Sequence, residues 1–296
     1  MLELSAGPIS ARVVPEAGGI VTRLNWRAPD GRLHKILRAP EGAYPTTTAP
    51  NMFGCWAMLP FANRAFDNVV DDGERRFTVT DNNEDGRGNI HGFGWQAAWD
   101  VLEYDRSHTV LEHHRSSGSD PYRYRARQEV RVDFAGMTIA LAILNESDFA
   151  LPFGLGLHPW FNCAPDTRLT LKAEGALVFG DGFRATGSRD FEDGGPYAEA
   201  PVFAGGEEIA WSLLGWDGIA RIETPSTGLA VSLTASQSLR SPVVWAPAGA
   251  DFLCVEPQSH AIGAPSEEAV RKVTPLRRLE PGETLSGWMR IAPQKL

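Results

Sequence analysis

The chain has 296 residues, of which 43% are hydrophobic and 22% are charged, and its formal net charge is −9. These values argue against a disordered chain, a collagen and a small disulfide scaffold, and the length allows one large domain or two small ones. Acidic residues exceed basic ones, 37 against 28, and no dense run of Lys or Arg interrupts that balance. We therefore expect no nucleic-acid partner.

The sequence gives no indication of a membrane span or of export. No stretch approaches the roughly 18 consecutive apolar residues that a span needs, and the first residues lack a basic leader followed by an apolar segment. We expect a cytoplasmic protein with no membrane partner. The three cysteines, Cys55, Cys163 and Cys254, are far apart, which predicts neither a disulfide framework nor a cysteine zinc site.

The predicted elements are short β-strands separated by Gly, Pro, Asn and Asp clusters. In chain order they cover residues 77–80, 123–134, 137–144, 169–172, 229–234, 252–255 and 288–291. In 123–134, every second residue from Tyr124 to Phe134 is uncharged and the residues between them are charged, which predicts a strand with one solvent-exposed face. The nearly all-apolar run 137–144 predicts the buried second strand of a hairpin.

No window of a dozen residues shows a helical period, and residues 267–272 allow at most a turn or two of helix. The Gly/Pro-rich patches 182–195 and 246–250 have the size of loops. No linker or repeat divides the chain. We therefore predict an all-β fold, a large antiparallel β-sandwich that forms a single domain over residues 1–296.

Known signatures for nucleotide binding, zincin proteolysis and α/β-hydrolase catalysis are absent from the sequence. Polar residues in apolar or turn segments are the remaining candidates. The first pair, Asn63-Arg64, follows an apolar stretch. Arg64 would either extend from a strand end to the surface or use its guanidinium to hold ligand hydroxyls.

His91 lies in a glycine-rich segment that also contains tryptophans. Gly92 and Gly94 permit close backbone approach, while Trp95 and Trp99 offer flat faces of the kind that stack on sugar rings. The competing interpretation is an ordinary turn histidine.

His158 is the one titratable group in the apolar run 152–161. Burial would favour its neutral form and a nearby carboxylate its charged form, so such a site can tune this histidine around neutral pH. A core histidine bonded to a backbone carbonyl is the alternative.

Glu256 ends an apolar strand, where an unpartnered acid is costly. It is therefore either paired structurally or used in chemistry. Together, His158 and Glu256 form an acid–base couple that could move protons on a neutral polyol without metal or cofactor.

The polar segments, in this order, resemble those of the aldose 1-epimerase family, also called galactose mutarotases. The resemblance runs from about residue 50 to residue 291 and is most specific in the H-P-W-F and V-E-P segments. The matching segments are Pro60-Phe-Ala-Asn63-Arg64, His91-Gly92, Gly154-Leu-Gly156-Leu-His158-Pro159-Trp160-Phe161, Val255-Glu256-Pro257 and Leu279-Glu-Pro281-Gly282-Glu283.

The resemblance implies a galactose mutarotase-type β-sandwich with Glu256 as the base for the anomeric hydroxyl and His158 as the acid for the ring oxygen. It further implies sugar-binding roles for Arg64 and His91, and it places Asn63 and Trp160 among the substrate-binding residues. The family's sugar-binding Asp is matched by Asp217, although here the following His and aromatic residue are missing. A turn aspartate before glycine is the alternative for Asp217.

The sequence therefore predicts a cofactor-independent, metal-free isomerase that interconverts the anomers of a free aldose such as galactose or glucose. Three alternatives stay open: a non-catalytic carbohydrate-binding protein of the same fold, a mutarotase for a hexose 6-phosphate, and a glycoside hydrolase or lyase. The last ranks lowest because hydrolysis ordinarily needs two opposed carboxylates. The Arg-rich segment 123–131 keeps the phosphate alternative open. The oligomeric state is undetermined.

Overall fold

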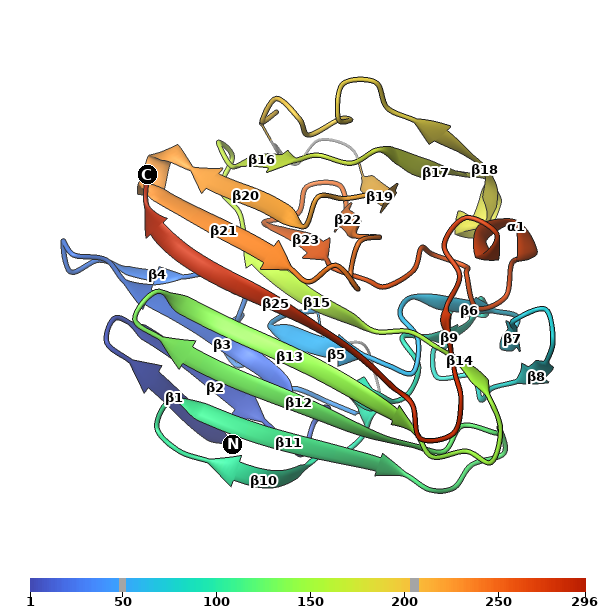
Figure 1. Cartoon of the computed structure of the whole chain (residues 1–296). Coiled ribbons are helices and arrows are strands. Elements are labelled where there is room, and N and C mark those ends of the chain that lie inside the picture. Colours follow the sequence, from blue (N-terminus) through green and yellow to red (C-terminus); the bar gives the residue numbers. More distant parts are fainter. Residues whose placement is uncertain (48–51, 203–207) are drawn as a thin grey trace.

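Two antiparallel sheets that face each other dominate the computed structural model, which describes residues 1–47, 52–202 and 208–296 (Figure 1). One sheet has 11 strands and the other has eight. The all-β prediction and the sandwich architecture are confirmed. Strands far apart in the chain share the smaller sheet, since β25 (Thr284–Lys295) pairs with β13 (Gly136–Asn145).

The 11-stranded sheet is built in the following order: β1 (Leu2–Ala6), β2 (Ile9–Val14), β3 (Ile20–Arg27), β5 (Cys55–Met58), β15 (Gly156–Asn162), β23 (Phe252–Glu256), β22 (Val243–Ala246), β19 (Ile209–Leu214), β17 (Gly175–Phe179) and β18 (Ala185–Asp190), with β4 (Leu33–Lys35) beside β3. The eight-stranded sheet runs through β10 (Asp100–Tyr104), β11 (His108–Arg115), β12 (Tyr124–Asp133), β13, β25, β21 (Leu229–Ala235), β20 (Ile219–Thr224) and β16 (Arg168–Leu171).

Three two-stranded sheets complete the fold. They pair β6 (Arg64–Phe66) with β9 (Gly88–Ile90), β7 (Val69–Asp71) with β8 (Arg76–Thr78), and β14 (Leu151–Phe153) with β24 (Arg277–Leu279). The α-helix in the described part of the chain is α1 (Glu268–Arg271), within the predicted 267–272. Short 3₁₀ turns cover Gly94–Gln96, Asp181–Phe183 and Pro225–Thr227. Within the described residues, no helix is long and apolar enough to span a membrane.

The structure corrects several strand predictions. The 182–195 loop prediction is wrong because β18 lies within it, a polar edge strand whose sequence shows no apolar alternation. β25 extends well beyond the predicted 288–291. Phe134 is exposed, not on the buried face, because β12 ends at Asp133. Alternate residues of β13 are only half-buried, since one face of its sheet lies outside the sandwich.

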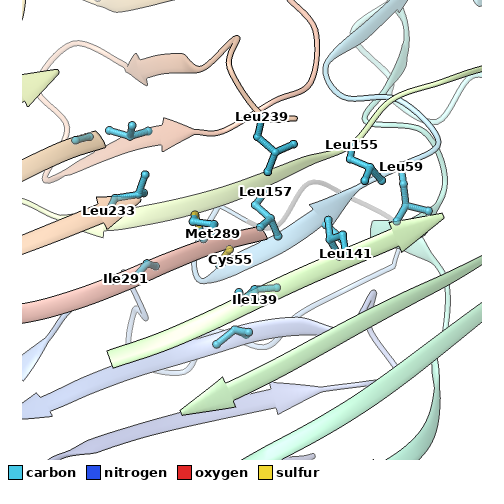
Figure 2. Packing of buried hydrophobic residues seen from close by; sticks show 14 of the residues in the cluster. Cys55, Leu59, Ile139, Leu141, Leu155, Leu157, Leu233, Leu239, Met289 and Ile291 are labelled. Atoms are coloured by element: carbon cyan, nitrogen blue, oxygen red, sulfur yellow. The ribbon is translucent and has the colours of Figure 1, made fainter. Parts of the chain in front are cut away.

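The hydrophobic core fills the space between the two sheets. Figure 2 shows Cys55 of β5 and Leu157 of β15 near Ile139 and Leu141 of β13 and Met289 of β25. Successive side chains of a strand point to opposite faces of its sheet. The odd-numbered residues of β5, β15 and β23 therefore face this core, and the even-numbered ones face the opposite side.

Truncation of Leu157 tests this core. Leu157 is fully buried, so Leu157→Ala should lower the free energy of unfolding by about 2–5 kcal/mol through lost burial and cavity formation. Urea denaturation measures this change. Ile219→Ala, at a side chain that is 57% exposed, is the control and should change stability by less than about 0.5 kcal/mol. Equal unfolding midpoints for both variants would contradict the assigned core.

Candidate active site

The strand register places His158 directly opposite Glu256. β15 pairs with β23 through Trp160 and Cys254, and the same alignment continues to a bridge between Gly156 and Gln258. His158 and Glu256 lie midway between these two pairs. Both are even-numbered positions, so their side chains lie on the face of the sheet away from the core.

His158 and Glu256 form a buried acid–base pair. Nε2 of His158 lies 3.4 Å from Oε1 of Glu256, and both side chains are less than a tenth exposed. Burial raises the pKa of Glu256 to about 8 and lowers the pKa of His158 to about 3. Near neutral pH the pair therefore holds one proton, carried by the carboxyl, and combines an acid with a base.

Gln258 fixes the orientation of this carboxyl group. Its Nε2 donates a 3.0 Å hydrogen bond to Oε2 of Glu256, and its side chain is fully buried. Because Oε2 is occupied, Oε1 is the oxygen that faces His158. This hydrogen bond also opposes the rise in the pKa of Glu256 that burial causes.

Two tryptophans hold the His158 ring. Trp160 stacks on it, with ring centres 5.0 Å apart and an angle of 6° between the ring planes. Trp56 packs against it with ring centres 4.4 Å apart. Trp56 is the cross-strand neighbour of His158 on β5. Such contacts restrict the imidazole to one orientation.

His91 presents an N–H group beside the pair. Its backbone has a φ of 61°, and its Nδ1 accepts a 3.0 Å hydrogen bond from the backbone N–H of Asn63. Burial, followed by the charges of His158 and Arg64, lowers the pKa of His91 well below its usual value. A neutral ring that accepts at Nδ1 carries its proton on Nε2, so His91 is a neutral donor.

Arg64 is anchored rather than free. Its side chain is 7% exposed. The guanidinium forms a bidentate ion pair with Asp85, and its Nη1 donates a 3.1 Å hydrogen bond to the Gly88 carbonyl. Arg87 also donates to Asp85. Burial lowers the pKa of Arg64, and Asp85 opposes this effect. Of the two interpretations of Arg64, extension to the surface is wrong.

These side chains surround a cavity of about 300 Å³. Six of the seven site residues predicted from the sequence line it, namely Asn63, Arg64, His91, His158, Trp160 and Glu256. Further lining residues that the sequence did not indicate include Met52, Trp56, Asn83, Arg87, Phe183, Glu208 and Trp245. The structure thus brings together residues that are nearly 200 positions apart.

Asp217, the seventh candidate, lies elsewhere. It is exposed in the turn before β20, in the other sheet, and its Oδ1 accepts a 2.9 Å hydrogen bond from the Ile219 N–H. This is the turn aspartate that the sequence offered as the alternative.

Two other expectations about sugar contacts also change. Trp95 and Trp99 are buried and bond to backbone carbonyls through their indole N–H groups, so neither offers a face to the cavity. The Arg-rich segment 123–131 belongs to β12 of the other sheet, where Arg125 and Arg127 pair with Glu112. That segment supplies no phosphate ligand here.

Gln258, Asp85 and Glu208 lie in or beside the candidate site but are hard to recognise from the sequence. Gln258 could have been found, since it follows Glu256 by two residues in an extended segment and so shares its face. Asp85 and Glu208 lie in polar stretches without a periodic pattern. Only the fold brings Asp85 to Arg64 and Glu208 to the cavity.

One group of potential metal ligands occurs among the described residues. Ligand atoms of His158, Cys254 and Glu256 lie within 4.8 Å of one another. Metal ligands must be deprotonated, whereas burial raises the pKa of both the Cys254 thiol and the Glu256 carboxyl. This donor set therefore fits a proton-transfer pair better than a metal site.

The sequence and the fold both have known relatives. The aldose 1-epimerase family model matches residues 1–292. The uncharacterized protein YphB of Escherichia coli K12 is 28% identical over 292 residues, which are 94% of this chain and 93% of that protein.

Among solved structures, a galactose mutarotase-like protein from Clostridium acetobutylicum has a TM-score of 0.84 at 20% identity, with 99% of this chain and 95% of that chain covered. The C. elegans GalM/aldose epimerase homologue has a TM-score of 0.83 at 16% identity, with 100% and 98% covered. At these identities the likeness shows a common fold.

The raised pKa of Glu256 predicts a pH-dependent stability. Between about pH 6.5 and 8 the folded protein holds a proton on Glu256 that the unfolded chain has lost, so the free energy of unfolding should fall as pH rises, by up to about 2 kcal/mol. The lowered pKa values of His91 and His158 act in the opposite direction, but only below about pH 6.5.

Urea unfolding at pH 6.5 and pH 8 measures this contribution. Glu256→Gln has no titrating carboxyl at this position, so its stability should fall less than that of the wild type over the same interval. Identical changes in the two proteins would contradict a proton held on Glu256.

Proposed function

Because the chain belongs to the aldose 1-epimerase family, we propose that it interconverts the α and β anomers of a free aldose, such as galactose or glucose, at the His158–Glu256 pair. The observation that carries this proposal is the buried pair itself, with Nε2 and Oε1 3.4 Å apart beside a cavity. A pair that holds one proton supplies both the acid and the base that ring opening needs.

In the proposed reaction the proton of the pair first moves from Oε1 of Glu256 to Nε2 of His158, 3.4 Å away. Glu256 then takes the proton of the anomeric hydroxyl while His158 gives its proton to the ring oxygen. The bond between C1 and the ring oxygen breaks, and C1 becomes the aldehyde carbon. Rotation about C1–C2 and closure with the proton transfers reversed yield the other anomer. After opening, Glu256 is protonated and His158 is neutral, which is the state that burial favours.

The surrounding donors fit the charge that develops during ring opening. His91 offers a neutral N–H close to His158, with ring centres 5.4 Å apart. Arg64 is held at the cavity wall by Asp85, so it would act as a fixed cation near the substrate. Preorganised donors of this kind stabilise a transition state without reorganisation. Asn63 and Trp160 complete the proposed sugar contacts, and Asp217 is not among them.

Removal of either proton-transfer group should abolish most of the activity. Glu256→Gln and His158→Gln should each lower kcat/KM for mutarotation by about 10²–10⁴-fold, the usual contribution of one general acid or base. Polarimetry of freshly dissolved α-D-galactose and α-D-glucose measures the rate. Asp217→Asn, outside the cavity, is the control and should behave as wild type.

Three results would contradict the proposal. If the wild-type protein leaves the spontaneous rate unchanged for every common aldose, the chain is not a mutarotase. Sugar binding without turnover, with no difference between wild type and Glu256→Gln, would favour the non-catalytic alternative. Turnover confined to hexose 6-phosphates would favour the phosphate alternative.

Loss of the Gln258 hydrogen bond should shift the pH profile. This bond opposes the rise in the pKa of Glu256, so Gln258→Leu should move the Glu256-dependent limb of the kcat/KM profile to higher pH and reduce kcat because the carboxyl is less well oriented. Mutarotation rates between pH 5 and 9 test this. An unchanged profile would show that Gln258 has no influence on the acid–base pair.

A further inference from the structure

His91 lies in a backbone bend that side-chain-bearing residues rarely adopt. Strand β9 ends at Ile90, and the next two residues, His91 and Gly92, have φ angles of 61° and 65°. A positive φ is uncommon outside glycine, and such strain persists only where the surrounding structure holds it. Because the bend sets the direction of the His91 ring, the groups that hold the bend also aim the ring.

The Asn82 side chain binds the peptide groups on both sides of His91. Its Nδ2 donates hydrogen bonds of 2.9 Å and 2.7 Å to the carbonyls of Ile90 and Gly92, and its Oδ1 accepts a 2.8 Å hydrogen bond from the Ile90 N–H. Gln96 holds this amide in turn, since its Oε1 accepts from Asn82 Nδ2 at 3.0 Å and its Nε2 donates to the Asn82 carbonyl. One amide group therefore spans the bend and fixes both of its ends.

Contacts from two other asparagines complete the support of His91. Its backbone N–H donates a 2.8 Å hydrogen bond to the Asn63 carbonyl, and its Nδ1 accepts from the Asn63 N–H. The fully buried Asn89 accepts a 3.1 Å hydrogen bond from the Gly92 N–H. With the backbone held by Asn82 and Nδ1 occupied by Asn63, the Nε2 proton is the group that His91 presents to the cavity.

We propose that Asn82 is a positioning residue that aims the Nε2–H group of His91 at the substrate. Among the described residues that line the cavity, His91 is included and Asn82 is not, so Asn82 acts on a bound sugar through the bend. A donor that is fixed in advance need not reorganise as charge develops in the transition state. This inference rests on the proposed function, because it takes His91 as a donor to the reacting sugar.

Asn82→Ala and Asn82→Asp remove the hydrogen bonds to the Ile90 and Gly92 carbonyls. Asn82→Asp keeps the size of the side chain and the oxygen that accepts from Ile90, so it provides a second test if Asn82→Ala does not fold. For mutarotation of α-D-galactose and α-D-glucose, followed by polarimetry, we expect kcat to fall about tenfold and KM to change less than about twofold, as for an interaction made in the transition state. An unchanged kcat would overturn the proposal.

Asn162→Ala is the matched control, at a half-buried asparagine outside the cavity. Its Nδ2 bridges the carbonyls on either side of Ile36, at 2.9 Å from Lys35 and 3.1 Å from Leu37. We expect it to lower the urea unfolding midpoint about as much as Asn82→Ala does and to leave kcat and KM unchanged. An equal fall of kcat in both variants would show that Asn82 acts only through general stability, and would overturn the proposal.

A double variant tests whether Asn82 acts through His91. His91→Gly permits the positive φ without strain and removes the donor, so it should lower kcat by about 10²–10³-fold. In that background Asn82→Ala should change kcat by less than about twofold, because the ring that Asn82 aims is gone. A further tenfold loss in the double variant would show that Asn82 acts independently of His91, which contradicts the proposal.

Nitrogen NMR shifts of the His91 ring give a readout that needs no turnover. The wild type and Asn162→Ala should show one neutral tautomer with its proton on Nε2, whereas mixing of tautomers in Asn82→Ala and Asn82→Asp should move the two nitrogen shifts toward each other. If the wild type shows no mutarotation, the proposed function fails, while this change would still support Asn82 as the residue that positions His91. A His91 spectrum that is unchanged in both Asn82 variants would overturn the inference whatever the turnover.

Discussion

The alternation of side chains along β15 and β23 is the constraint on which the site depends. Leu157 and Val255 are fully buried in the core between the sheets, which fixes the pairing of the two strands, because a slip of one residue would turn every side chain to the other face. With that register set, His158 and Glu256 must lie opposite each other on the far face. The hydrophobic core therefore determines the geometry of the acid–base pair.

Burial then gives this pair its chemistry. A carboxyl in an apolar environment retains its proton, and an imidazole in the same environment releases it. Trp160 and Trp56 pack against the His158 ring, Gln258 orients the carboxyl, and the Asp85 carboxylate holds Arg64 in place. Trp160 and Gln258 lie two residues from the groups that they contact, whereas Trp56 and Glu256 reach His158 from remote strands, so the site is a product of the whole sandwich.

The cavity also combines two electrostatic environments. Arg64 and Arg87 lie on one side, where Asp85 offsets much of their charge, whereas Glu208 lines the cavity without an ion pair among the described residues. Such a distribution leaves little net attraction for an anionic ligand and many hydrogen-bonding groups for a neutral one.

Local period and polar groups in apolar runs were enough to predict the β-rich class, the strands with clear alternation, and the candidates His158 and Glu256. The sequence could not reveal the edge strand β18 or the partner Asp85, since neither leaves a periodic or apolar signal. Nor could it choose between a site and a turn for Asp217, because a local motif fits both. Strand pairing over long separations decided these points, as only the folded register states which side chains share a face.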